Sequence, residues 1–166
     1  MFMQAIKKYI LPLVILALLI LFAFYFNKRM QAPDVTFTTL AGKTIHMADL
    51  KGKVVLVNFW STDCLACVRE MPDLVQTYKR YKDKGLEVIA VAMYYDPPAQ
   101  VLNYATQKAL PFAVMHDGFG EMEKKFHGVG VTPTTFIFDK TGQRLFYKVG
   151  ELDFINLNQL LDKALN

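Results

Sequence analysis

The longest apolar run of the chain lies close to its N-terminus. Residues 10–26 form 17 consecutive positions without a charged or amide side chain, and basic pairs flank them at 7–8 and 28–29. A membrane-spanning helix needs about 20 apolar residues, with about 17 at the short end, and Tyr9 can extend this run. The pattern predicts an N-terminal anchor at 1–30, with a transmembrane helix over about 9–26 and a linker at 31–34.

A cleaved signal peptide is the alternative interpretation of this segment. A small-x-small cleavage motif is missing, because Ala32 has Met30 at its minus-three position and Pro33 directly after it. An uncleaved anchor is therefore favoured. Three positive charges precede the run (Lys7, Lys8 and the terminal amine) and two follow it, which favours an inside N-terminus and an outside domain.

Residues 35–166 alternate between strand-like and helix-like patterns. Continuous apolar runs predict buried strands at 54–60 and 86–93. An apolar period of three to four residues predicts a helix from Leu65 onward, ended by Gly85. Further strands are expected at 35–40, 44–47, 113–116, 134–139 and 143–149, and further helices at 100–109, 121–126 and 154–165. This order predicts an α/β domain whose mixed sheet is covered by helices on both faces.

Charge narrows the range of partners. The chain has 19 Lys and Arg against 15 Asp and Glu, and 53% of its residues are hydrophobic, which excludes a disordered chain. Four of the basic residues lie in the predicted anchor, which has no acidic residue, so residues 31–166 carry 15 charges of each sign. A neutral domain lacks the basic surface that nucleic acid requires, and no nucleic-acid partner is expected.

Both cysteines of the chain fall in one C-x-x-C motif. Cys64 and Cys67 stand where the strand at 54–60 gives way to a helix. The free amides and the dipole of a helix N-terminus stabilise a thiolate, so Cys64 is predicted as the nucleophile and Cys67, one turn later, as the resolving thiol. A structural zinc site needs four ligands, and the sequence has no second pair of this kind. We therefore expect a redox-active Cys64–Cys67 disulfide, without a metal or cofactor.

The motif at 60–67 (WSTDCLAC), after the buried strand VVLVNFW, and the motif at 131–136 (VTPTTF) resemble those of thioredoxin-fold oxidoreductases. The similarity is greatest to the membrane-anchored TlpA/ResA-like thiol–disulfide oxidoreductases of the redoxin (AhpC/TSA) superfamily, and it covers roughly residues 33–166. The resemblance implies a three-layer thioredoxin-like fold with a central mixed sheet and an N-terminal β-hairpin extension.

The resemblance also implies roles for residues around the cysteines. Pro133 is expected to follow a cis peptide and to face the pair, while Trp60 and the Thr132 backbone contribute to substrate binding. Glu70 lies near the same side of the helix as the cysteines and is implied to tune them and to move protons. An ordinary strand-start proline and a solvated helix charge remain the alternatives for Pro133 and Glu70.

Two positions depart from the family pattern. Asp63 precedes Cys64 where the family commonly has an aromatic residue, and Leu65 and Ala66 between the cysteines include no proline. A carboxylate beside Cys64 disfavours its thiolate and makes the couple a better reductant. Asp63 could instead cap the helix and leave the sulfur atoms unaffected.

The sequence thus predicts an enzyme that reduces partner-protein disulfides by thiol–disulfide exchange. It is expected to sit in the cytoplasmic membrane through residues 9–26, with its domain in the periplasm or otherwise outside the cytoplasm. The resemblance implies apocytochrome c or a copper-site assembly protein as substrate, and a membrane thiol-reducing system as electron donor.

Two other functions are alternatives to this one. A thiol peroxidase is suggested by Ser61-x-x-Cys64, which resembles the T-x-x-C motif of peroxiredoxins, but Val57 stands where the upstream proline belongs. A Cu(I) metallochaperone, which is not an enzyme, would use the two thiolates, with Met93 and Met115 as further ligands. The position of both methionines beside buried strands favours a role in the core instead.

Overall fold

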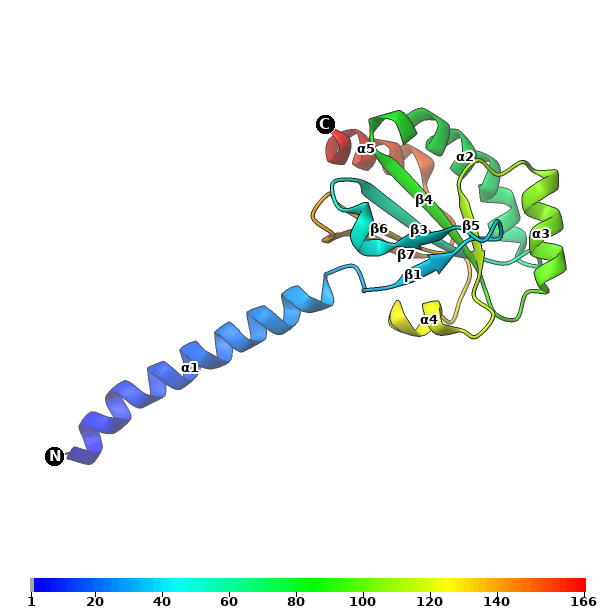
Figure 1. Ribbon diagram of the computed structural model, residues 1–166. Helices are drawn as coiled ribbons and strands as arrows, with labels where there is room; N and C mark the ends of the chain where they lie inside the picture. The colour runs from blue at the N-terminus through cyan, green and yellow to red at the C-terminus, as the bar shows by residue number, and fades with distance from the viewer. Residues whose placement is uncertain (1) are drawn as a thin grey trace. The chain divides into compact units, whose positions relative to one another are not determined.

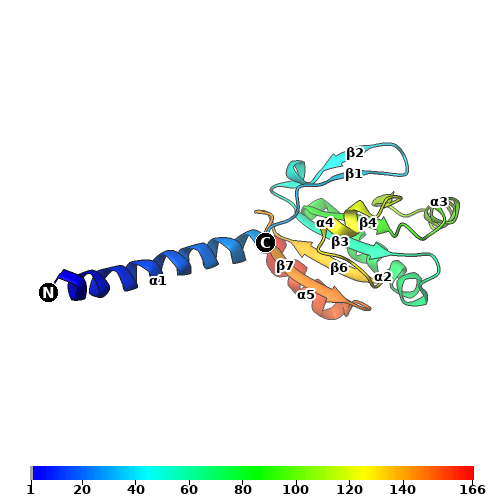
Figure 2. The same cartoon turned by 90° about the horizontal axis from the view of Figure 1, so that it is seen from below.

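The computed structural model describes residues 2–166, apart from the side chains of 2–8, 23, 24 and 26–29. The chain divides into two compact units, Met1–Gln31 and Ala32–Asn166. Figure 1 and Figure 2 together label the helices and strands of both. The basic side chains predicted to flank a membrane span, at 7–8 and 28–29, lie outside the described residues.

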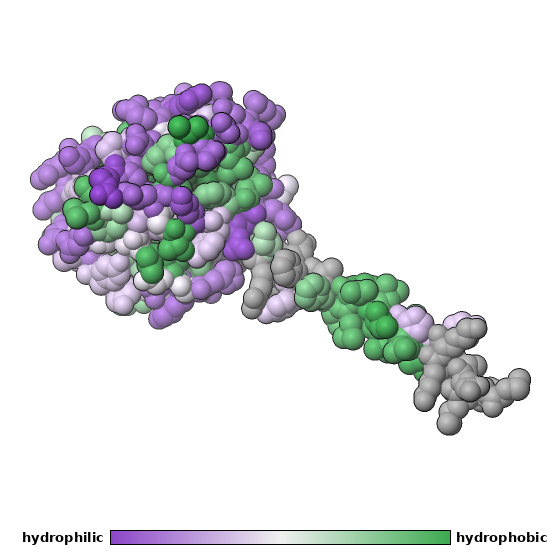
Figure 3. All heavy atoms as spheres, turned by 180° about the vertical axis from the view of Figure 1, so that it is seen from behind, coloured by the Kyte–Doolittle hydropathy of each residue, from purple (hydrophilic) through white to green (hydrophobic). Residues whose placement is uncertain are grey.

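The first unit is the helix α1 (Phe2–Arg29), which continues through Pro12. Its large apolar side chains from Tyr9 to Phe22 are 48–64% exposed, and Figure 3 shows them as a largely hydrophobic surface along the helix. Over the residues that the structure describes, none of the helices has the length and apolar character needed to cross a membrane. The span at 9–26 includes side chains outside the described set and stays a prediction from the sequence.

The second unit is built on a five-stranded mixed sheet with the order β5-β4-β3-β6-β7. Three strands are parallel: β3 (Val54–Trp60), β4 (Leu86–Ala92) and β5 (Ala113–His116). Two further strands complete the sheet: β6 (Thr134–Phe138) pairs antiparallel with β3, and β7 (Arg144–Val149) pairs antiparallel with β6. All seven residues of β3, the central strand, are buried, as expected for a continuous apolar run. The predicted mixed sheet is confirmed.

Alternate residues of the central strands form two separate cores. On one face, Leu56 and Val88 pack with residues of α2 (Leu65–Tyr81), α3 (Pro98–Gln107) and α5 (Phe154–Leu165). On the other face, Val57 and Val91 pack with α4 (Glu121–Lys125), with the 3-10 turn η1 (Met47–Leu50) and with the hairpin described next. Figure 2 shows the sheet between α2 and α5 on one side and the hairpin on the other. The predicted coverage of both faces is confirmed.

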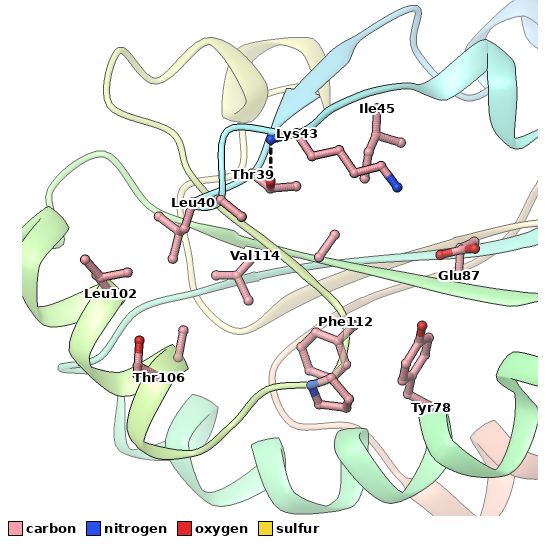
Figure 4. Close-up of a pocket in the computed structure, with 14 residues that line it drawn as sticks. Thr39, Leu40, Lys43, Ile45, Tyr78, Glu87, Leu102, Thr106, Phe112 and Val114 are labelled. Atoms are coloured by element: carbon pink, nitrogen blue, oxygen red, sulfur yellow. Dashed lines mark hydrogen bonds between the residues drawn. The ribbon is translucent and has the colours of Figure 1, made fainter.

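The hairpin consists of β1 (Thr36–Thr38) and β2 (Thr44–His46), which are shorter than the predicted strands at 35–40 and 44–47. Its turn contains Gly42 at φ 77°, a conformation that favours glycine. The Leu40 N–H donates to the Val114 carbonyl at 2.8 Å, which joins the hairpin to edge strand β5. A cavity of about 580 Å³ lies between the hairpin, β5 and α3; Figure 4 shows its lining, which does not include the cysteines.

The helices follow their predicted positions with small shifts at the ends. Helix α3 begins at Pro98 rather than at residue 100, because proline is favoured in the first turn of a helix. Helix α2 ends at Tyr81, where the short 3-10 turn η2 (Lys82–Lys84) leads into Gly85 at φ 101°. Helix α5 begins after Asp153, whose carboxylate accepts the N–H groups of Ile155 and Asn156.

Candidate active site

Cys64 and Cys67 lie at the N-terminus of α2, directly after the central strand β3. They form a disulfide with a Cα–Cα distance of 5.2 Å, which confirms the predicted pairing. Cys64 is partly exposed, whereas Cys67 is fully buried. A partner molecule can therefore reach only the first of the two sulfur atoms.

The helix start is electrostatically suited to a charged sulfur atom. Cys64 is the N-cap residue of α2, and its Sγ accepts the N–H of Cys67 at 3.1 Å. After reduction, the same amide and the helix dipole stabilise a thiolate at Cys64. Because Cys64 takes the N-cap position, the alternative that Asp63 caps the helix is wrong. Asp63 is exposed, and its carboxylate has no hydrogen-bond partner among the residues that the structure describes.

A buried carboxylate that sequence reasoning missed holds the loop in front of Cys64. Asp96 is only 2% exposed, and its two carboxylate oxygens accept the N–H and the hydroxyl of Thr62, each at 2.6 Å. The Asp96 carbonyl also contacts Nε2 of His116 at 2.8 Å. Strands β3 and β4 are parallel neighbours, so the segments that follow them meet at one edge of the sheet. The sequence signal that could have identified Asp96 is an acidic residue just after the second buried strand.

The loop before β6 contacts Cys64 at the N-terminus of α2. The Thr132–Pro133 peptide bond is cis, as predicted, and Pro133 is buried. The Thr132 carbonyl oxygen lies 3.5 Å from Cys64 Sγ, which confirms that this segment faces the cysteine pair. In the dithiol form, the Cys64 S–H can donate to this carbonyl. The Thr132 N–H has no hydrogen-bond partner within the described part of the chain.

Glu70 is buried one turn after Cys67, at 5% exposure, so its alternative interpretation as a solvated helix charge is wrong. Its carboxylate accepts two hydrogen bonds of 3.0 Å, one from Nδ2 of Asn58 on β3 and one from the N–H of Leu152. Burial raises the pKa of Glu70, and the hydrogen bonds from Leu152 and Asn58 offset this only in part. A buried carboxylate with a raised pKa therefore lies three residues after Cys67 on α2.

Asn58 is a second residue that sequence reasoning missed. It is fully buried on the central strand, and its Nδ2 donates to Thr135 Oγ1 at 3.1 Å as well as to Glu70. An amide inside an otherwise apolar strand was a visible signal, but its partners on α2 and β6 are far away in sequence. The asparagine therefore fixes the carboxylate of Glu70 against the sheet.

The substrate contact of Trp60 that the resemblance implies stays a prediction. Trp60 is fully buried, with its ring 5.1 Å from the ring of Tyr104 on α3. As the last residue of β3, it belongs to the core on the α2 side of the sheet, which also contains Cys67. The Thr132 backbone and Cys64 remain within reach of a partner.

The structure does not support the extra copper ligands. Met93 and Met115 are buried in the core on the α4 face of the sheet, whereas Cys67 belongs to the core on the α2 face. No group of three or more His, Cys, Asp or Glu among the described residues is arranged to hold a metal ion. Ser61, the residue that suggested a peroxidase, accepts the N–H of Asp63 through its hydroxyl.

Comparison with known proteins agrees with this geometry. Residues 29–143 match the family model described as the AhpC/TSA family. The chain belongs to the AhpC/TSA family. It is 40% identical over 121 residues to thiol-disulfide oxidoreductase ResA of Bacillus thuringiensis (strain Al Hakam), which covers 73% of this chain and 69% of that protein. The protein of the same name in Bacillus cereus (strain ATCC 10987 / NRS 248) is 38% identical over 145 residues, covering 84% and 83%.

A solved structure extends the similarity to three dimensions. The crystal structure of a thioredoxin-family thiol:disulfide interchange protein from Chlorobium tepidum TLS matches with a TM-score of 0.76 and 29% identity, over 82% of this chain and 97% of that one. The thioredoxin-like α/β fold with a central mixed sheet is confirmed. This AhpC/TSA-family protein is a thiol–disulfide oxidoreductase, and its relatives imply a disulfide-bearing substrate protein.

Proposed function

We propose that this AhpC/TSA-family enzyme reduces disulfide bonds in partner proteins, with Cys64 as the attacking thiol and Cys67 as the resolving thiol. The observation that carries the proposal is the asymmetry of the pair. Cys64 is partly exposed and accepts a helix amide at 3.1 Å, whereas Cys67 is fully buried behind it. The first sulfur is accessible and stabilised as a thiolate, and the second is protected from external disulfides.

The reaction proceeds in two exchanges. The Cys64 thiolate attacks one sulfur of the partner's disulfide, a mixed disulfide forms, and the partner's other sulfur leaves as a thiolate. The Cys67 thiolate then attacks Cys64 Sγ, which releases the partner's second thiolate and forms the Cys64–Cys67 disulfide. Two electrons pass from the enzyme dithiol to the partner. A separate thiol donor must reduce the enzyme again before the next cycle.

Glu70 serves the second exchange as a proton acceptor. It lies three residues after Cys67 on α2, a spacing that brings two helix side chains to about 5–6 Å between their Cβ atoms. Burial raises the pKa of Glu70, which makes the carboxylate a stronger base than an exposed one. The hydrogen bonds from Asn58 and Leu152 hold it in one orientation. Glu70 can therefore accept the Cys67 thiol proton as the mixed disulfide is resolved.

The charge of Asp63 supports reduction as the net direction. Its exposed carboxylate is adjacent in sequence to Cys64, and no described residue neutralises it through a hydrogen bond. A negative charge beside Cys64 disfavours the thiolate and thus the reduced form of the couple. A couple whose reduced form is less stable has a more negative reduction potential.

A redox equilibrium with glutathione tests this direction. We expect the Cys64–Cys67 couple to have a more negative potential than the glutathione couple. Asp63→Asn should shift the potential upward by on the order of 10 mV at low salt, and less at high salt, because salt screens exposed charges. Asp73→Asn, which removes an exposed carboxylate later in α2, is the matched control and should leave the potential unchanged. A wild-type potential equal to or above that of glutathione would contradict a reducing role.

The proposal includes a membrane tether and an extracytoplasmic domain. It is supported by the 17 uncharged positions at 10–26 and by the exposure of the apolar side chains of α1, such as Leu16 at 53% and Leu19 at 59%. The family resemblance supports apocytochrome c or a copper-site assembly protein as the substrate. It also supports a membrane thiol-reducing system as the electron donor.

Membrane fractionation tests the tether. The full-length protein should sediment with membranes and resist alkaline extraction, while the matched variant Leu18→Lys, which places a charge at the centre of the run, should be released. In intact cells, a membrane-impermeant maleimide should label Cys64 of the reduced protein only if the domain lies outside the cytoplasm. Release of the wild-type protein at alkaline pH would contradict the tether, and protection of Cys64 from labelling would contradict the orientation.

A further inference from the structure

Exposed apolar side chains are concentrated around the disulfide. Among the described residues of the second unit, ten large apolar side chains are exposed, and five of them belong to segments next to the site. Leu65 (78%) and Val131 (58%) adjoin Cys64 and Thr132 in sequence. The other three are Tyr94, Tyr95 and Phe119, at 52%, 52% and 87%. Single exposed apolar residues are ordinary, but a cluster at a reactive group marks a contact surface.

A series of contacts runs from the disulfide to this aromatic group. Cys64 Sγ lies 3.5 Å from the Thr132 carbonyl, and the Thr132 hydroxyl lies 3.4 Å from the hydroxyl of Tyr95. The Tyr95 ring packs edge-on against the ring of Tyr94, with centroids 5.4 Å apart. Tyr94 in turn lies against Gly120, where an added Cβ would be 3.5 Å from its ring. We call Tyr94 and Tyr95, together with Phe119 beside Gly120, the aromatic strip.

Hydrogen bonds of two buried carboxylates fix the backbone at both ends of the aromatic strip. Tyr94 and Tyr95 directly precede Asp96, whose buried carboxylate is bound to Thr62 in the loop before Cys64. At the far end, the Asp117 carboxylate accepts the N–H groups of Glu121 and Glu123 and so fixes the turn that contains Phe119 and Gly120. The backbone segments that carry the three rings are therefore fixed near the attacking sulfur, and each ring is at least half exposed.

We propose that the aromatic strip is a specificity surface, which selects partner segments carrying an aromatic or large aliphatic side chain close to the cysteine under attack. This inference rests on the proposed function, since it names the class of protein segment that the Cys64 site reduces. The strip is continuous with the surface at which every substrate must react. An extended segment advances about 3.3 Å per residue, so a side chain two positions from the partner's cysteine lies about 7 Å away and on the same face. A side chain at that distance can extend past Thr132 and contact Tyr95, which lies next to Thr132.

Aromatic rings suit this task because they bury a large area while losing few rotatable bonds. The Tyr95 hydroxyl is already engaged by Thr132, so the open face of the ring can accept an apolar group without leaving a polar atom unpaired. A glycine- or serine-flanked cysteine would react at Cys64 without this contact. We therefore expect selection by sequence around the partner's cysteine, in addition to selection by accessibility.

Two synthetic peptides test the proposal with the full-length enzyme. Each contains one intramolecular disulfide, and they differ only in having phenylalanine or serine two positions from the first cysteine. The reduced wild-type enzyme should reduce the phenylalanine peptide roughly tenfold faster, and the variant Tyr94→Ala/Tyr95→Ala should lose this preference. Tyr147→Ala is the matched control, because Tyr147 is also 52% exposed but lies on β7 outside the strip.

Glutathione disulfide serves as the third substrate, since it is too small to cover the strip. Its rate should stay within about twofold in the double variant, which also shows that the variant folds and keeps its chemistry. Equal wild-type rates on the two peptides, or a preference that survives in the double variant, would overturn the inference while leaving disulfide reduction in place. Turnover of glutathione disulfide without reduction of either peptide would instead remove the proposed function, and the inference with it.

Discussion

Replacing Cys64 by serine is expected to lower the rate of disulfide reduction by at least about 10³-fold, because a serine hydroxyl is not ionised near neutral pH and cannot form a mixed disulfide. The structure gives no substitute nucleophile, since Cys67 is fully buried. The rate is measured with a disulfide peptide and excess reductant. A thermal melt should first confirm that the variant unfolds at the same temperature as the reduced wild-type enzyme. The Cys64→Ser substitution removes the accessible sulfur atom but no buried side chain, so the fold should be retained.

Cys67→Ser is the informative partner of this variant. Once the variant has been reduced and the reductant removed, it should also stop multiple turnover, but it should still expose about one equivalent of partner thiol, because Cys64 can attack and no second enzyme thiol resolves the product. A burst with Cys67→Ser and none with Cys64→Ser is the expected pair of results. Steady turnover by Cys64→Ser at near the wild-type rate would show that the two roles are assigned the wrong way round.

The second large effect is expected from Glu70→Gln. The carboxylate accepts from both Asn58 and Leu152, whereas a glutamine has one carbonyl oxygen and one NH₂ group, so its NH₂ must face a donor. An unpaired buried donor costs about 1–3 kcal/mol, and the free energy of unfolding should fall by that amount. Loss of the proton acceptor should also slow the resolution of the mixed disulfide, by about 10²-fold.

The pH dependence of stability gives this variant a second readout. Burial raises the folded-state pKa of Glu70 above its ordinary value of 4.5, so the native state binds more protons than the unfolded state between these two values. The free energy of unfolding should therefore decrease as pH rises from about 4.5 through the folded-state pKa of Glu70, and level off above it. Urea denaturation of Glu70→Gln across this range should lack the decrease, and the exposed-site control Asp73→Asn should retain it. An identical profile in Glu70→Gln and wild type would contradict a buried titrating Glu70.

Local patterns predict most of the domain because its central strands have few alternatives. The run at Val54–Trp60 is apolar at nearly every position, short, and rich in β-branched and aromatic residues, which favours a strand buried on both faces. The sequence also predicted the redox pair Cys64 and Cys67, since a C-x-x-C at the start of a helix suits thiolate chemistry. The cis bond before Pro133 came from family resemblance alone, because a proline before a strand is compatible with either isomer.

The parts that the sequence did not predict depend on contacts between distant segments. The hydrogen bonds of Asn58 to Glu70 and Thr135 join β3 to α2 and β6, and no local pattern specifies them. Asp96 and Thr62 meet only because β3 and β4 pair in parallel. The substrate contact of Trp60 was implied by the family resemblance alone, and no local pattern specified that the alternation of side chains along β3 directs Trp60 into the core.

The most direct test of a Cys64-initiated exchange is the mass of the trapped intermediate. Reduced Cys67→Ser protein is mixed with a disulfide peptide, the reaction is stopped with acid, and the adduct is digested and sequenced by mass spectrometry. We predict one peptide attached through Cys64 in nearly every molecule, and no adduct with the Cys64→Ser protein under the same conditions. Absence of an adduct from Cys67→Ser, or an equally fast adduct at Cys67 in Cys64→Ser, would contradict the account.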